Sequence, residues 1–299
     1  MVSQRPRRGV AMDAHESTAM LVARPNLPLV VSAPKPQGIL LPGLPEKYQI
    51  IKKYNSTPSS GLYKGIEQKT KQEIFVKECF YKPDFQRELT ASVKLSLSGN
   101  NDFIVPIQAC FPEQQYLIMP YMEGRTLWNY TISMDGLEPE WMFDLASQIA
   151  QGLEQIHGAG IIHNDLKSGN VLLTASSASR RLTAKITDFG FSSCGVAALE
   201  PFRGAGTPQY VAPEKKIGKN PLTSAVDIFS FGLLVHEMLT NKLLYEVITP
   251  SYRQVIPAHP RIPDKVLEVI RTACEFEPGN RFKTAGEMIN ALEAAVYSI

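Results

Sequence analysis

The sequence has few of the residues from which metal and redox sites are built. It contains four cysteines, and the two nearest, Cys79 and Cys110, lie 31 positions apart, which excludes a CxxC pair and a dense disulfide framework. The five histidines are equally scattered, with no HExxH pair and no Cys/His cluster, which argues against a protein-only zinc site. We therefore expect a reducing compartment, either the cytoplasm or a cytosol into which the protein is delivered.

Long apolar runs and a charge imbalance are also missing. No run approaches the roughly 18–20 apolar residues that a membrane-spanning helix needs, so we expect no membrane span. The 31 basic and 29 acidic residues give a net charge of +2, which provides no broad field to attract nucleic acid. The sequence does have 44% hydrophobic residues in a chain of 299, enough for one large core or two modest lobes.

Residues 1–45 are the least patterned part of the chain. They hold seven of the 22 prolines and show no helical or strand period, so we predict a flexible N-terminal tail outside the fold. Asp13 and Glu16 precede any apolar stretch, which argues against a cleavable secretory signal. The apolar patches LPLVV and ILLPGL are the features of this segment most able to pack on the rest of the protein.

From residue 46 the sequence shows strand patterns. KYQIIKKY, GLYKGI and EIFVKE are separated by turn-rich stretches and predict an antiparallel meander, to which FIVPIQACF and QYLIMPY add two strands. One helix is predicted by apolar residues at four-residue intervals, namely Phe85, Leu89, Val93 and Leu97. These patterns indicate a small lobe over about residues 46–121.

The rest of the chain, about 122–298, has helical patterns. WMFDLASQIAQGLEQIH carries an amphipathic stripe made of Met142, Leu145, Ile149, Leu153 and Ile156. SAVDIFSFGLLVHEML is apolar nearly all round, which predicts a helix buried in the middle of its lobe. Two lobes joined near residues 120–125 would leave a cleft between them, a common place for ligands.

Five short motifs follow one another in the second half of the chain. They are HNDLKSGN (163–170), DFG (188–190), GTPQYVAPE (206–214), DIFSFG (227–232) and PGNRF (278–282). In this order the chain resembles the eukaryotic-type protein kinases, over roughly residues 46–298. The resemblance implies an α+β, bilobal protein-kinase-like fold, with a small antiparallel β-sheet lobe plus one helix and a larger, mainly α-helical lobe. It also implies ATP and Mg²⁺ as cofactors.

The resemblance assigns roles in phosphoryl transfer to residues of the large lobe. Asp165 would orient the substrate hydroxyl and accept its proton, Lys167 would face the γ-phosphate, and Thr207 would brace both. Asn170 and Asp188, the first residue of DFG, would bind Mg²⁺. Taken singly, Asp165 and Asp188 have a second interpretation, as turn carboxylates that cap loops or helices.

Two segments of the small lobe resemble the nucleotide-binding parts of the family. IFVK is similar to the VAIK motif, which makes Lys77 the contact to the α- and β-phosphates and Glu88 its expected partner. YLIMPYMEGRTL resembles the hinge, where Met119 would lie at the back of the pocket and the backbones of Tyr121 and Met122 would bind adenine. An ordinary core strand is the alternative for the hinge, since only main-chain contacts are implied.

Two departures from the family pattern concern phosphate groups. Asn55, Thr57 and Ser60 stand at the three positions of the glycine-rich loop, where glycine would permit positive φ and close approach to phosphate. Hydroxyl groups of this loop are the remaining candidates for binding phosphate. Asn164 stands where the family has an Arg before the catalytic Asp165, and that Arg gathers a phosphate on the activation segment. We therefore predict activity without phosphorylation of this segment.

The resemblance also implies two structural features of the large lobe. Glu214 and Arg281 are positioned as a buried ion pair, and Asp227 as a buried acid that braces the catalytic loop. Buried charges of this kind need partners, so removal of one should cost about 3–5 kcal/mol.

These observations predict a serine/threonine protein kinase that transfers the ATP γ-phosphate to Ser or Thr hydroxyls of protein substrates. DLKSGN and GTPQYVAPE favour Ser and Thr over Tyr as acceptors. The alternative is a pseudokinase scaffold that binds a partner with weak or no catalysis, which the degraded loop favours. A small-molecule kinase is a weaker third possibility, because APE and the long segment 191–211 suit a protein substrate. The sequence does not specify an oligomeric state.

Overall fold

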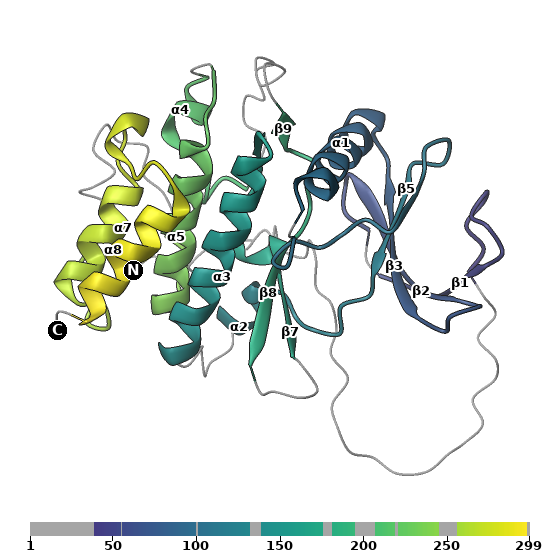
Figure 1. The fold of residues 1–299 in the computed structure, drawn as a ribbon, viewed down its shortest axis with the longest axis horizontal. Helices are drawn as coiled ribbons and strands as arrows, with labels where there is room; N and C mark the ends of the chain where they lie inside the picture. The colour runs from purple at the N-terminus through teal and green to yellow at the C-terminus, as the bar shows by residue number, and fades with distance from the viewer. Residues whose placement is uncertain are drawn as a thin grey trace, which may run out of the picture.

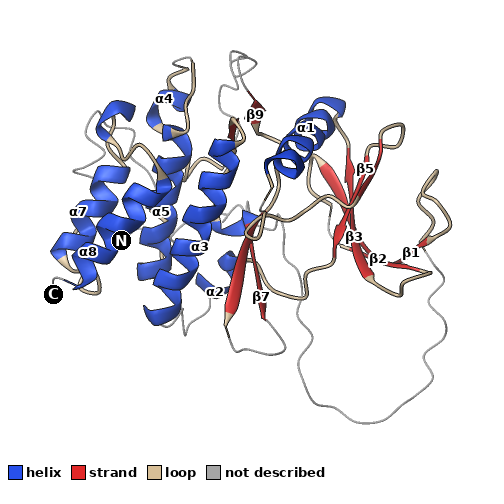
Figure 2. Ribbon diagram, in the orientation of Figure 1, coloured by secondary structure: helices blue, strands red, loops and turns tan. Residues whose placement is uncertain are grey.

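The chain forms two lobes in a computed structural model (Figure 1). The structure describes residues 39–54, 56–99, 101–131, 139–175, 181–194, 207–218, 221–244 and 256–297. Strands and one helix make up the small lobe, and helices dominate the larger one, as Figure 2 shows by colour. The predicted α+β, bilobal fold is confirmed. Among the described helices, none is both long and apolar enough to cross a lipid bilayer.

A five-stranded antiparallel sheet forms the body of the small lobe. Its strands are β1 (Tyr48–Lys53), β2 (Ser60–Glu67), β3 (Glu73–Cys79), β4 (Ala109–Phe111) and β5 (Tyr116–Pro120). They lie in the order β1-β2-β3-β5-β4, so β3 is central and pairs with both β2 and β5. Side chains alternate across a sheet, and Ile74 and Val76 of β3 enter the small-lobe core. Phe75 and Lys77 therefore face the other side, toward the large lobe.

Residues 39–45 pack on this sheet, although the sequence analysis placed them in the tail. Ile39 pairs with Ile50 of β1, and Leu41 is 7% exposed in the cluster that contains Tyr48 and Ile50. The Tyr116 hydroxyl donates a hydrogen bond to the carbonyl of Pro42 at 3.2 Å. Apolar side chains of ILLPGL thus pack on the sheet despite Pro42, and the folded part begins at least seven residues before residue 46.

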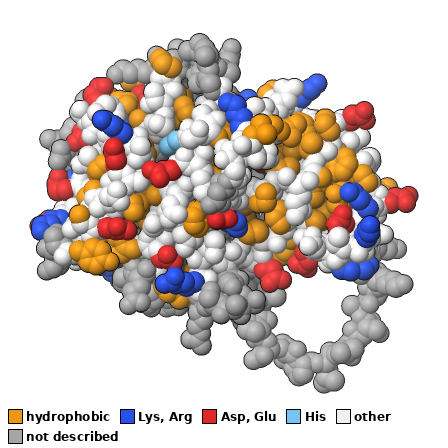
Figure 3. Space-filling model, viewed as in Figure 1, with side chains coloured by type: hydrophobic (Ala, Val, Ile, Leu, Met, Phe, Trp, Pro, Cys, Tyr) orange, Lys and Arg blue, Asp and Glu red, His pale blue; other side chains and the backbone are white. Residues whose placement is uncertain are grey.

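Helix α1 (Lys82–Ser98) packs beside the sheet, but its buried stripe differs from the predicted one. Phe85 is buried, whereas Val93 is 49% and Leu97 82% exposed. Positions four apart drift by about 40° per step on a helix of 3.6 residues per turn, so the predicted row leaves the interface. The buried residues are Phe85, Glu88, Ala91 and Leu95. Figure 3 shows apolar side chains gathered over the face that carries α1 and the sheet.

The large lobe is built around α3 (Pro139–Gly158) and α5 (Ala225–Thr240). The other helices that the structure describes in this lobe are α2 (Leu127–Thr131), α4 (Pro213–Lys216), α7 (Asp264–Ala273) and α8 (Ala285–Tyr297), with short 3₁₀ turns η1 (Ser168–Asn170) and η3 (Pro278–Asn280). The predicted stripe of α3 is buried throughout, and α5 is buried on nearly every side, as expected. Both helices contribute to one large hydrophobic core.

Short strand pairs carry the loops that face the small lobe. They are β6 (Ile161–Ile162) with β9 (Ser193–Cys194), and β7 (Val171–Ala175) with β8 (Leu182–Ile186). The loop 163–170 joins β6 to β7, and residues 187–192 join β8 to β9. Both loops therefore leave this strand cluster at the junction of the two lobes (Figure 1).

The packing of residues 39–45 can be tested with two neighbouring leucines. Leu41→Ala should lower the free energy of unfolding by about 2–5 kcal/mol, because it removes buried methyl groups and leaves a cavity. Leu40→Ala should change it by less than about 0.5 kcal/mol, since Leu40 is 88% exposed. Chemical denaturation measures both. Equal effects of the two substitutions would show that residues 39–45 do not pack on the sheet.

Candidate active site

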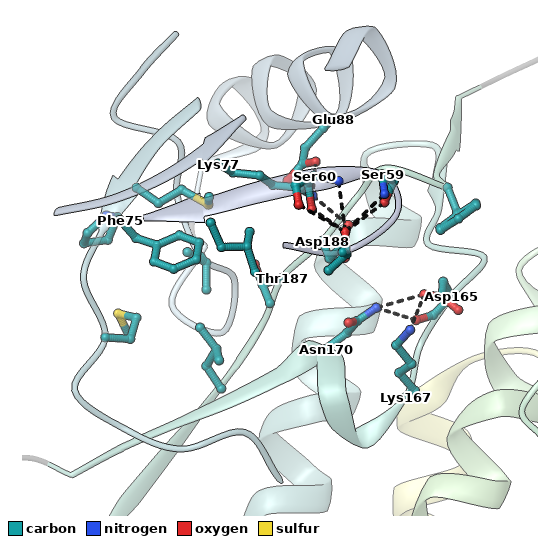
Figure 4. Close-up of a pocket in the computed structure, with 18 residues that line it drawn as sticks. Ser59, Ser60, Phe75, Lys77, Glu88, Asp165, Lys167, Asn170, Thr187 and Asp188 are labelled. Carbon is teal, nitrogen blue, oxygen red and sulfur yellow. Dashed lines mark hydrogen bonds and ion pairs between the residues drawn. The ribbon is translucent and has the colours of Figure 1, made fainter. Parts of the chain in front are cut away.

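Three charged side chains from distant parts of the chain meet at the junction of the lobes. Lys77 Nζ lies 2.6 Å from Glu88 Oε2 and 2.9 Å from Asp188 Oδ1 (Figure 4). Strand β3 supplies Lys77, the buried stripe of α1 supplies Glu88, and the segment after β8 supplies Asp188. The Lys77 side chain is 12% and that of Glu88 2% exposed, so these two charges meet with little water, whereas Asp188 is 36% exposed toward the cleft. The expected pairing of Lys77 with Glu88 is confirmed.

The electrostatics of this triad favour the charged forms of Lys77 and Asp188, whereas burial raises the pKa of Glu88. Burial alone would lower the pKa of Lys77, but the carboxylates of Asp188 and Glu88 outweigh it and raise that pKa above the usual value. Burial would likewise raise the pKa of Asp188, but the Lys77 ammonium holds it below the usual range. Asp188 is therefore a carboxylate at neutral pH.

The loop 163–170 holds a second charged centre around Asp165. Lys167 Nζ lies 2.9 Å from Asp165 Oδ2 and donates to Thr207 Oγ1 at 2.7 Å. The amide N–H of Thr207 donates to Asp165 Oδ1 at 2.9 Å. Asn170 Nδ2 donates to the carbonyl and Oδ2 of Asp165, at 2.9 and 3.1 Å (Figure 4). Four residues that the sequence singled out thus form one network, and Thr207 braces both Asp165 and Lys167.

Asp227 of α5 fixes the start of this loop from within the large lobe. Its carboxylate accepts the amide N–H of His163 and of Asn164, each at 2.8 Å, and contacts His157 Nε2 at 2.9 Å. Burial would raise the pKa of Asp227, but its bond to His157 and the charge of that ring hold it below the usual value. The predicted brace is confirmed, with His157 as an additional member that the sequence did not indicate.

The side chain and the carbonyl of Asn164 each make one hydrogen bond within the large lobe. Its φ of 67° is in the left-handed region that Asn tolerates, and its Nδ2 donates to Ser193 Oγ of β9 at 2.9 Å. The ammonium of Lys215, a residue that is 3% exposed, donates to the Asn164 carbonyl at 2.6 Å. Burial lowers the pKa of Lys215, although Asp227 and Asp165 oppose that shift. Sequence inspection missed Lys215 because a Lys beside APE predicts a surface charge.

The loop between β1 and β2 uses its hydroxyl groups to stabilise itself. Thr57 Oγ1 accepts the amide N–H of Ser60 at 2.9 Å and lies 2.8 Å from Ser60 Oγ. Ser59 also contacts Thr57 Oγ1, through its amide and its hydroxyl. Thr57 and Ser60 line the cleft, as the resemblance implies, but their mutual bonds close a turn. Asn55 lies outside the described residues.

The hinge differs from the expectation at one position. Met119 and Met122 line the cleft together with Pro120. Tyr121 is directed elsewhere: its amide donates to the Glu73 carbonyl at 3.1 Å, and Lys64 Nζ lies 3.8 Å from the centroid of its ring. That amide completes the pairing of β5 with β3 and is therefore not available to adenine. Contact of adenine with the Tyr121 carbonyl and the Met122 backbone stays a prediction.

Both charged centres open into one cleft between the lobes. The cleft holds about 830 Å³ of space between its walls, a volume that includes the part open to solvent. The lining residues that sequence reasoning missed are Leu62, Phe75, Val105, Leu172, Thr187 and Phe191. Most are apolar members of strands or loops, so their patterns could not distinguish cleft from core.

Below the cleft, Glu214 and Arg281 form the predicted buried ion pair. The two guanidinium nitrogens donate to the two carboxylate oxygens, each at 2.7 Å, and the Arg281 side chain is 0% exposed. Arg281 also donates to carbonyls of Ala225, Glu275 and Phe276. The pair thus ties the end of the segment that contains Thr207 to the C-terminal helices.

This ion pair provides a stability test. Arg281→Met should lower the free energy of unfolding by about 3–5 kcal/mol, because Glu214 would be left as an unpaired buried charge. Arg261→Met, at an exposed arginine of the same lobe, should change it by less than about 0.5 kcal/mol. Urea denaturation with matched baselines measures both; a loss below about 1 kcal/mol for Arg281→Met would contradict the assignment.

Comparison with known proteins gives a consistent result. Residues 52–291 match the model of the protein kinase domain. The chain is similar to the serine/threonine-protein kinase PknA of Corynebacterium glutamicum, with 31% identity over 188 residues, 60% of this chain and 39% of that protein. It is also similar to the probable serine/threonine-protein kinase PknB of Lactococcus lactis, with 26% identity over 267 residues, 82% of this chain and 41% of that protein.

A third relative is the serine/threonine-protein kinase PknA of Mycobacterium tuberculosis, 25% identical over 278 residues, which are 86% of this chain and 62% of that protein. The chain thus spans about 40% of the length of the first two relatives. The match to the kinase domain covers well over half of the 299 residues. The chain therefore belongs to the protein kinase domain family.

Proposed function

We propose that this protein is a serine/threonine protein kinase that transfers the γ-phosphoryl group of ATP to Ser or Thr hydroxyls of protein substrates. The observation that carries the proposal is the position of Asp165. Its carboxylate is held by Lys167, Asn170 and Thr207, and it opens into the same cleft as the Lys77–Glu88–Asp188 triad. Phosphoryl transfer needs a positioned carboxylate and a cluster of charges that bind the nucleotide, both within reach of one ligand.

In this scheme Asp165 acts on the acceptor. The hydroxyl oxygen of the substrate bonds to the γ-phosphorus as the bond from phosphorus to the ADP oxygen breaks, and the hydroxyl proton passes to Asp165. Lys167 lies beside Asp165 and offsets negative charge on the transferred group. Lys77 would hold the α- and β-phosphates, with Glu88 fixing its direction.

The residues present fit a magnesium ion. Asn170 uses its amide nitrogen to bind Asp165, which leaves its oxygen, a ligand type that Mg²⁺ prefers, on the other side (Figure 4). Asp188 supplies an ionised carboxylate. Among the described residues, no group of three or more His, Cys, Asp or Glu side chains could hold a metal, so phosphate oxygens would complete the coordination. When bound, Mg²⁺ neutralises charge on the phosphates.

The contacts of Asn164 support activity without phosphorylation of the activation segment. In the family, an Arg at this position binds a phosphate on that segment. Here Asn164 bonds directly to Ser193 of β9, and the buried ammonium of Lys215 reaches the Asn164 carbonyl. A fixed internal cation and a neutral bond would then do what a phosphate and an Arg do elsewhere. Residues 195–206 of the segment lie outside the described residues.

Two further elements of the proposal concern the compartment and the extent of the kinase unit. All four cysteines are free thiols, in keeping with a reducing compartment such as the cytoplasm or a cytosol reached by delivery. We take residues 39–297 as the kinase unit, since residues 39–45 pack on the small lobe. The acceptor would be a protein, as in the family.

The alternative function is a pseudokinase that binds a partner with weak or no catalysis. The observation that favours it is the β1–β2 loop, where the hydroxyl of Thr57 closes a turn with Ser60. Among the described residues of that loop, the amides of Ser59 and Ser60 are then engaged by Thr57 and not by a phosphate. The intact pairing of Lys77 with Glu88 and the network around Asp165 favour the kinase.

The catalytic assignment predicts the effect of two conservative substitutions. Asp165→Asn and Asp188→Asn should each lower phosphoryl transfer from labelled ATP to a generic protein substrate by at least about a hundredfold. The first removes the proton acceptor and the second a metal ligand, while neither empties core volume. Asp144→Asn, at an exposed carboxylate of α3, is the matched control. Transfer within about threefold of the wild type in either variant would exclude the mechanism.

The contacts of Asn164 predict the response to dephosphorylation. Protein treated with phosphatase, and shown by intact mass to carry no phosphate, should transfer phosphoryl groups within about twofold of the untreated protein. The physical reason is that neither Asn164 nor Ser193 needs a phosphate to join β9 to the catalytic loop. Loss of activity on phosphatase treatment, restored by phosphorylation, would contradict this part of the proposal.

A further inference from the structure

Phe75 lies in the roof of the cleft, two residues before Lys77 and on the same face of β3. Side chains two apart on a strand point the same way, so the direction that brings Lys77 to the triad brings Phe75 to the inner part of the cleft. In register, Phe75 pairs with Met119 and Lys77 with Leu117. Phe75 is one of the lining residues, and its ring projects into the pocket (Figure 4).

The family motif has a small residue at this position. VAIK carries Ala two residues before its Lys, whereas IFVK of this chain carries Phe75. An Ala side chain ends at Cβ and leaves the space beneath the roof to a ligand. The same backbone with Phe sends an aromatic ring into that space.

The ring of Phe75 contacts a cluster that joins the two lobes. The cluster consists of Val105, Met119 and Leu172, and Phe75 packs against it together with Met122 and Ile107. Met119 belongs to β5 of the small lobe, whereas Leu172 belongs to β7 of the large lobe. Leu172 is 7% and Met119 5% exposed, so protein side chains already cover the floor and the back of this part of the cleft.

We infer that Phe75 occupies the place of the nucleobase and thereby sets the nucleotide specificity of the cleft. The inference rests on the proposed function, since it concerns how ATP would be bound. A planar base can lie between roof and floor only if the Phe75 ring turns away and gives up its packing. Phe in a strand has more than one common χ1 angle, so such a turn is possible.

The two ends of the cleft therefore contribute unequally to the binding of ATP. Lys77 and the other polar groups at the triad end can hold a triphosphate and Mg²⁺, whereas the base gains little because it must displace a packed ring. Only molecules whose ring is turned away can bind the base, so the apparent affinity for ATP equals the intrinsic affinity multiplied by the fraction of such molecules. The site therefore binds ATP weakly and distinguishes poorly between ATP, GTP and a triphosphate without a base.

Calorimetry in the presence of Mg²⁺ tests the inference with three probes: ATP, GTP and inorganic tripolyphosphate. For the wild-type chain, the three dissociation constants should agree within about fivefold. For Phe75→Ala, ATP should bind at least about tenfold more tightly than it does to the wild type, while tripolyphosphate binding should stay within about twofold. The matched control is Phe111→Ala, a partly buried Phe that packs on the opposite face of the same sheet; its affinities should equal those of the wild type.

Several results would overturn the inference. If the wild-type protein binds ATP far more tightly than tripolyphosphate, the nucleobase is bound without hindrance from Phe75. Weaker ATP binding by Phe75→Ala means that the ring stacks on the base, and unchanged binding means that it does not hinder it. If Phe75→Ala has a much lower melting temperature, Phe75→Val is measured in its place with the same expectation. If the wild type transfers phosphoryl groups but the Phe75 variants bind ATP no more tightly, this inference fails and the proposed function stands. If the wild type neither transfers phosphoryl groups nor binds ATP, the proposed function fails as well.

Discussion

The arrangement of the two lobes depends on the ion triad of Lys77, Glu88 and Asp188. The lysine is on the central strand, the glutamate on the only helix described in the small lobe, and the aspartate in the large lobe. The lysine ammonium lies 2.6 Å from the glutamate and 2.9 Å from the aspartate. Burying such charges is costly unless each finds its partner, and loss of one partner leaves the others uncompensated. The triad thus fixes the position of α1 against the sheet and the direction of the segment after β8. The cleft lies between these elements, so its shape depends on the triad.

Asp165 is also a buried charge that needs partners, and more of its partners are neutral groups. The backbone of residues 163 and 164 is fixed by the buried carboxylate of Asp227, and the side chain of Asp165 by Lys167, Asn170 and Thr207. Lys215 adds a buried cation to the same loop. These contacts hold the loop without a phosphate group, which is the physical basis for expecting a preassembled site. The two centres together make the cleft suited to a phosphorylated ligand.

Residues that carry charge or special chemistry could be predicted from the sequence, whereas residues that act through shape could not. The motifs identified both centres, and the buried pair of Glu214 and Arg281, because charges in a core need specific partners. The bond that occupies the Tyr121 amide could not be predicted, because a single segment does not reveal which strand it pairs with. Phe75 passed unnoticed since an apolar strand residue has the same pattern in a core and in a cleft. Leu41 was assigned to the tail because prolines masked a short apolar patch.

The most direct test of the account is the titration of the Lys77 ammonium group. In protein labelled with ¹⁵N at lysine Nζ, the resonance that disappears in Lys77→Met belongs to this residue, and its chemical shift can be followed with pH. The account predicts a pKa above the ordinary value of 10.5, because two carboxylates at 2.6 and 2.9 Å outweigh burial, and a lower value in Glu88→Gln. A pKa at or below the ordinary value in the wild-type chain would mean that the triad does not form and would contradict the account.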